Sequence, residues 1–289
     1  MFTIENTHLS VVINPKGAEL QSIYNKVLQM EYMWSGDPAF WGKKSPVLFP
    51  VVGTLKEDTY YFNGHAYHLG RHGFARDMDF TVTAQTGNTV TFTLESNEMT
   101  LAVYPFAFRF NVKYELNENS VKTTYFISNA GKSAMYFSVG GHPAFKIPLA
   151  AGAAYNDYYL EFNNPEHAGR WPISADGLIE TTPAEVFNQS NKLPLSKELF
   201  QKDALVFKGL SSNSVVLKCD KNAHGLLFDF TGFPYLGIWA AKNADFVCIE
   251  PWCGIADSVN TDQQLINKEG IHHLQPSKNF ERTWSVTVF

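Results

Sequence analysis

Residues 108–127 read FRFNVKYELNENSVKTTYFI, and this stretch decides the fold class. Every second residue from 108 to 116 is apolar, a polar turn follows at 117–120, and another apolar-rich run covers 121–127. Because successive side chains of a strand point to opposite faces, the alternation predicts a β-hairpin with one apolar and one polar face.

Similar short runs, separated by turn residues, recur along the chain. A second hairpin is predicted over 80–94 around the turn at 86–88. Further strands are predicted at 9–13, 215–218, 225–230, 235–239, 246–249 and 283–289, with an edge strand within 46–53, single helical turns at 37–41 and 195–200, and long loops with short strands over 148–194. This pattern predicts an all-β fold, a large antiparallel β-sandwich with a few short helical turns. We find no repeat or linker, so residues 1–289 are expected to form one domain.

The composition limits the kind of partner. Aromatic residues make up 15% of the chain and charged residues only 18%, which favours strands and suits the stacking of aromatic rings on sugars. The net charge of -5 comes without long runs of one sign. We therefore expect neither nucleic acid nor a membrane as a partner, but a small molecule bound by a monomer or homodimer.

Cysteine usage and the N-terminus bear on the compartment. The chain has three cysteines, at 219, 248 and 253, an odd count that favours reduced, buried thiols over disulfides. The N-terminal residues lack the pattern of a secretory signal, and no apolar run approaches membrane-spanning length. We expect a cytoplasmic protein.

Two strand ends carry residues suited to proton transfer. In residues 137–145, FSVGGHPAF, His142 follows two glycines and precedes a proline; in residues 246–252, FVCIEPW, Glu250 follows an apolar run and Trp252 offers an aromatic platform. A carboxylate and an imidazole on opposite sides of a ligand can add one proton and remove another. The plainer alternatives are a histidine that caps a turn and a carboxylate exposed at a strand end.

The stretch GRHGFAR at 70–76 is the third candidate. Arg71 and Arg76 flank His72 in a glycine-bracketed loop, which indicates a patch that donates hydrogen bonds to hydroxyls, a phosphate or a carboxylate, unless it is a solvated turn. A metal site combining His72 with His65 and His68 is disfavoured, because no cysteine or paired acid is near and 65–68 reads as a strand. Neither a metal nor a cofactor is expected.

These motifs, together with KDAL at 202–205, resemble the aldose 1-epimerase (galactose mutarotase) family and, within it, the LacX-like branch. The resemblance runs over essentially the whole chain. It implies a galactose mutarotase-like sandwich and a cofactor-independent isomerase that interconverts the anomers of an aldohexose in carbohydrate metabolism. From the sequence alone Asp203 also reads as the cap of a turn or helix.

The resemblance also implies a role for each residue. Glu250 would be the base that takes the anomeric proton, and His142 the acid that protonates the ring oxygen. His72, Arg76 and Asp203 would hold the sugar. Many relatives have an arginine after the Phe-Pro pair at 49–50, whereas Lys56 is the nearest cation here, so the sugar could be phosphorylated or modified.

Two other functions stay open at this stage. One is a sugar-binding or sensing protein with the same pocket but no turnover. The other, a glycoside hydrolase with two carboxylates, is disfavoured because only Glu250 lies in a motif-like setting.

Overall fold

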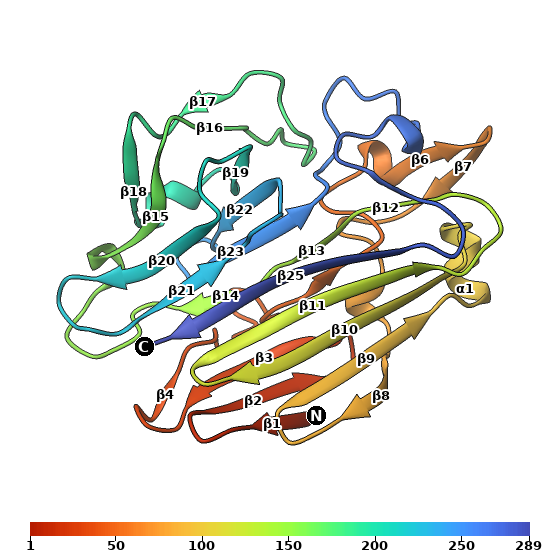
Figure 1. The fold of residues 1–289 in the computed structure, drawn as a ribbon. Coiled ribbons are helices and arrows are strands. Elements are labelled where there is room, and N and C mark those ends of the chain that lie inside the picture. Colours follow the sequence, from red (N-terminus) through yellow and green to blue (C-terminus); the bar gives the residue numbers. More distant parts are fainter.

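In the computed structural model, which describes residues 1–289, the strands form two main antiparallel sheets and several smaller ones (Figure 1). The largest has nine strands in the order β18 (Ser190–Pro194), β15 (Tyr158–Glu166), β20 (Ser214–Cys219), β21 (Gly225–Asp229), β25 (Asn279–Val288), β11 (Ser120–Asn129), β10 (Phe108–Asn117), β9 (Thr89–Glu95) and β8 (Thr81–Gln85). The second has the order β19 (Leu205–Lys208), β22 (Tyr235–Trp239), β23 (Phe246–Cys253), β13 (Val139–Gly141) and β5 (Val47–Leu48), and β14 (Ala144–Lys146) also pairs with β23.

Smaller elements surround these two sheets. A four-stranded sheet contains β1 (Phe2–Glu5), β2 (Leu9–Asn14), β3 (Glu19–Asn25) and β4 (Met30–Glu31). Three strand pairs are β6 (Thr59–Phe62) with β7 (His65–His68), β12 (Met135–Phe137) with β24 (His272–Leu274), and β16 (Gly169–Arg170) with β17 (Ala184–Glu185). The helices are α1 (Glu98–Val103) and the 3₁₀ turns η1 (Lys56–Asp58), η2 (Ala75–Asp77), η3 (Tyr155–Asp157), η4 (Lys197–Phe200) and η5 (Leu265–Asn267). None of them has the length and apolar character needed to cross a lipid bilayer.

The predicted hairpin over 108–127 is confirmed. β10 and β11 pair from Phe108 opposite Asn129 to Asn117 opposite Ser120, so the turn itself is only two residues long. Their buried side chains alternate along both strands, as the sequence predicts. The hairpin over 80–94 is also confirmed, as β8 and β9 at one edge of the same sheet.

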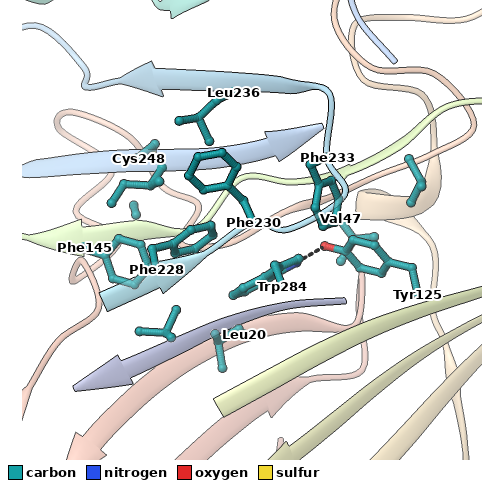
Figure 2. Close-up of a cluster of buried hydrophobic side chains, with 14 of the residues drawn as sticks. Leu20, Val47, Tyr125, Phe145, Phe228, Phe230, Phe233, Leu236, Cys248 and Trp284 are labelled. Carbon is teal, nitrogen blue, oxygen red and sulfur yellow. Dashed lines mark hydrogen bonds between the residues drawn. The ribbon is translucent and has the colours of Figure 1, made fainter. Parts of the chain in front are cut away.

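The core is one apolar cluster of 69 buried residues, to which the two main sheets and the four-stranded sheet all contribute. Figure 2 shows Phe228 and Trp284 from the nine-stranded sheet facing Phe145 from the six-stranded sheet, with the Phe145 and Phe228 rings 5.9 Å apart. Within this core the indole N–H of Trp284 donates to the Tyr125 hydroxyl at 2.9 Å, so both buried polar groups are satisfied. The predicted antiparallel sandwich is therefore correct.

Two strands are longer than predicted, although the region 148–194 otherwise has the expected loops and short strands. β15 is a nine-residue strand paired on both sides, within the region predicted to be mostly loop. β23 continues past the predicted end at 249 and through Pro251. Proline donates no hydrogen bond, and it is tolerated there because the pairing of β13 with β23 ends at Gly140 and Trp252, before Pro251.

The shorter predictions hold. At 37–41 the Trp41 amide donates to the Asp37 carbonyl at 2.9 Å, which closes a single turn, and η4 falls within 195–200. β5 is an edge strand, as predicted for 46–53. The three cysteines are free and buried.

Candidate active site

A cavity of about 450 Å³ opens beside the six-stranded sheet. Six chain segments that are distant in sequence contribute to its wall. The lining residues are Trp41, Arg71, His72, Arg76, His142, Phe200, Lys202, Asp203, Ala204, Trp239, Ala240, Lys242, Glu250 and Trp252. All the predicted site residues except Lys56 are among them.

Strand register places His142 opposite Glu250. On one side of the gap between β13 and β14, Gly140 pairs with Trp252, and on the other side Ala144 pairs with Cys248. The same antiparallel register, carried into the gap, puts position 142 across from position 250. β13 thus ends at the two glycines, and β14 begins just after the proline. His142 lies in the gap between these two strands.

The side chains of this pair are close and shielded from water. Nε2 of His142 lies 3.2 Å from Oε2 of Glu250, and these residues are 8% and 1% exposed. No hydrogen bond joins them, and Oε2 of Glu250 and Nδ1 of His142 are buried without a protein partner. Polar groups left in this state cost roughly 1–3 kcal/mol each, which a ligand rich in hydroxyls would recover.

Burial sets the protonation of the pair. It raises the pKa of Glu250 well above its ordinary value, an effect that Arg71 opposes and Asp203 reinforces. Burial also lowers the pKa of His142 to about 3, helped by the charges of Arg71 and Arg76. Burial therefore disfavours the charged form of each group.

Gly53 fixes the orientation of His72. Its amide N–H donates to Nδ1 of His72 at 3.0 Å, and the His72 amide donates back to the Gly53 carbonyl at 2.9 Å. Since Nδ1 accepts a hydrogen bond, the neutral imidazole carries its proton on Nε2, which makes that nitrogen a donor. Burial, then the charge of His142, lowers the pKa of His72 well below its ordinary value. His72 is thus a neutral hydrogen-bond donor rather than a cation.

Backbone strain accompanies this contact. His72 has a φ of +69° and Gly53 a φ of +74°, both in the left-handed region that side chains disfavour. A Cβ on Gly53 would lie 2.4 Å from the Cβ of Ala256, so only glycine fits. Strain of this kind persists where the surrounding structure holds it, commonly at functional sites.

Asp203 and Arg71 meet across the cavity wall. Oδ1 of Asp203 is 3.8 Å from Nη2 of Arg71, and it also accepts the amide of Ala204 at 2.7 Å, so the capping role and the site role coexist. Arg76 lies on η2, where its Nε has no hydrogen-bond partner and is 3.6 Å from the exposed Asp77.

Aromatic residues complete the wall. Trp41 lies 4.9 Å from the His142 ring at an interplanar angle of 32°, and the Trp239 ring meets the same imidazole nearly edge-on at 5.5 Å. Trp252, on β23 beside Glu250, is buried with its indole N–H unpaired. Trp41 and Trp239 were missed in the sequence because no motif surrounds them. Trp239 would have been predicted to line the site if the pairing of β22 with β23 had been known. In that pairing Gly237 is opposite Glu250, and Trp239, two residues on, lies on the same face of the sheet.

Lys56 lies away from the cavity. Its backbone amide donates to Oδ2 of Asp257 at 3.0 Å, and the other carboxylate oxygen accepts from the buried Lys268 at 2.7 Å. The prediction that Lys56 contacts the ligand therefore finds no support in this arrangement. The cations Lys202 and Lys242, which were not among the predicted site residues, line the cavity instead.

One group of side chains has the spacing of a metal site. The donor atoms of His142, Cys248 and Glu250 lie within 4.8 Å of one another, whereas His65 and His68 do not take part. Zinc suits such donors, but burial and the neighbouring Glu250 raise the pKa of the Cys248 thiol well above its ordinary value. The acid and base chemistry of the pair needs no ion.

Comparison with known proteins defines the class. The sequence profile described as aldose 1-epimerase matches residues 1–272. The chain belongs to this family.

Relatives of similar length place the chain more closely. It is 33% identical over 295 residues to protein LacX, chromosomal, of Lactococcus lactis subsp. lactis, covering 99% of this chain and 98% of the relative. A galactose mutarotase related enzyme from Lactobacillus acidophilus is 39% identical with a TM-score of 0.96, covering 100% and 97% of the two chains. A galactose mutarotase-like protein from Lactobacillus casei is 31% identical with a TM-score of 0.93, and both chains are covered completely. The predicted LacX-like branch is thereby confirmed.

Proposed function

We propose that this protein is a mutarotase that interconverts the α and β anomers of an aldohexose by acid and base catalysis. The observation that carries the proposal is the buried pair of His142 and Glu250, 3.2 Å apart in the cavity. The names of the solved relatives, a galactose mutarotase related enzyme and a galactose mutarotase-like protein, support it.

Ring opening requires one proton to leave the sugar and another to arrive. The Glu250 carboxylate takes the proton of the anomeric hydroxyl, the C1–O5 bond breaks, and the protonated His142 gives its proton to O5. An open-chain aldehyde results. Rotation about C1–C2 presents the other face of the aldehyde, and the reverse proton transfers close the ring as the other anomer.

Burial disfavours the charged forms of both groups, and the uncharged pair suits the closing half of this cycle. A neutral Glu250 carboxyl can donate to the aldehyde oxygen while a neutral His142 accepts the proton of the attacking hydroxyl. Opening a closed ring starts from the alternative state, with one proton moved from the carboxyl to the imidazole. His72, held by Gly53 as a neutral donor, supplies a hydrogen bond to a sugar oxygen throughout, and Asp203 and Arg71 bind further hydroxyls.

The test is the rate of anomer exchange, measured by NMR saturation transfer between the α and β anomeric protons of glucose, galactose and their 6-phosphates. The native protein should accelerate exchange for at least one of these sugars. Glu250→Gln, which keeps the shape but cannot take a proton, should lose about 10²- to 10⁴-fold of that acceleration. Glu98→Gln, on the exposed first turn of α1, is the matched control and should retain it.

Two results would contradict the proposal. Equal rates for the native protein and Glu250→Gln would show that Glu250 is not the catalytic base. Saturable binding of a sugar without acceleration above buffer would make the protein a sugar-binding member of the family that lacks turnover.

A further inference from the structure

The cavity has a charge opposite to that of the whole chain. The protein carries 23 lysines and arginines against 28 acidic residues. The cavity is lined by four cations, Arg71, Arg76, Lys202 and Lys242, against the two carboxyl groups of Asp203 and Glu250. Four cations therefore face at most two carboxylates.

Internal pairing leaves two of these cations free. Arg71 lies 3.8 Å from Asp203, and Arg76 lies 3.6 Å from Asp77. Lys202 and Lys242 form no ion pair, and both are exposed. Most other exposed lysines of the chain are unpaired as well, so what distinguishes Lys202 and Lys242 is that both line the cavity. Two unpaired lysines on one cavity form a positive rim that attracts an anion.

The two lysines come from neighbouring strands. The ladder between β19 and β22 begins with Leu205 opposite Ile238. Lys202 precedes β19 and Lys242 follows β22, so both leave the sheet at the same end of this ladder. Glu250 lies beside Gly237 in the next ladder, toward the interior of the sheet, where it is buried. The reacting pair is therefore at the floor of the cavity, and the lysines are at its mouth.

The chemistry of mutarotation restricts where an anionic group can be attached. The oxygen on C1 must carry a proton for the base, and the ring oxygen must be free to accept one. An anionic substituent must therefore be on another carbon, and it would extend away from the floor toward the mouth. We infer that the preferred substrate is an aldohexose with a phosphate or other anionic group remote from C1, held by Lys202 and Lys242. This inference rests on the proposed function.

The experiment compares kcat/KM for anomer exchange of glucose and galactose with that of their 6-phosphates and of galacturonate. We expect at least a tenfold preference for a phosphorylated sugar over its free form. In the double variant Lys202→Ala/Lys242→Ala this preference should fall at least tenfold. Lys132→Ala, which removes an exposed lysine outside the cavity and outside any ion pair, should keep the ratio.

Salt and the carboxylate sugar provide further readouts. The preference should shrink as the ionic strength rises, because these lysines are exposed to screening. A preference for galacturonate over the phosphates would identify a carboxylate as the anionic group. Equal or faster exchange of the free sugars, or a preference unchanged in the double variant, would overturn this inference while leaving the mutarotase intact. Acceleration of none of the sugars would overturn both.

Discussion

Lowering the pH from 7 to 5 should destabilise this protein by about 2 kcal/mol at a single residue, His142. Its pKa is about 3 in the folded chain because it is buried, and about 6.5 in an unfolded chain. Between these values the unfolded chain binds a proton that the folded chain does not. The free energy of unfolding contributed by this group is therefore complete above pH 6.5 and decreases as the pH falls toward 3. At pH 5, 1.5 units below the unfolded value, the loss is about 2 kcal/mol at 1.36 kcal/mol per unit.

The assay is urea denaturation at pH 7 and pH 5 for the native protein and for His142→Gln. Other titrating groups contribute to both proteins and cancel when the two pH dependences are subtracted. The native protein should lose about 2 kcal/mol more than the variant. Identical losses would contradict this prediction, because they would mean that the imidazole titrates normally despite its burial.

Glu250 supplies a check of opposite sign. Its pKa is raised by burial, so the folded chain binds a proton that the unfolded chain releases above pH 4.5. Its contribution to stability is complete below that pH and decreases as the pH rises toward the folded value. Glu250→Gln should remove this contribution, so the variant should lose more stability than the native protein on going from pH 7 to pH 5.

Two further substitutions test the walls of the site. Gly53→Ala should destabilise the fold by about 2–5 kcal/mol in urea denaturation and reduce anomer exchange, because the added Cβ meets Ala256 at a positive φ. Gly64→Ala is the control: its φ is +78° but nothing lies within 4 Å of the added Cβ, so it should cost only about 1–2 kcal/mol in the same assay. Trp41→Ala should lower kcat/KM for anomer exchange roughly 2- to 10-fold, because it removes the ring that packs on His142. Trp41→Phe, which keeps an aromatic ring, should retain most of the rate. An unchanged rate for the alanine variant would exclude this positioning role.

Much of the site could be predicted from the chain because its motifs are local. Glycines, a proline and a buried-looking strand marked His142 and Glu250, and the structure brings both to one cavity. Lys56 was chosen for its closeness in sequence to an expected arginine, and the chain instead turns it away through the contact of its amide with Asp257. No sequence motif surrounds Lys242. It reaches the cavity only because β22, the strand before it, pairs with β19 and β23.

The layered β architecture follows from the residue pattern alone, because the direction of a side chain alternates along a strand whatever the strand pairs with. It also determined which residue types could transfer protons. Which loops meet depends on long-range packing. His142 faces Glu250 through a register that joins segments more than a hundred residues apart, and Gly53 selects the tautomer of His72 from another loop. Depressed and raised pKa values follow from the same packing, because they depend on how completely distant segments exclude water from these groups.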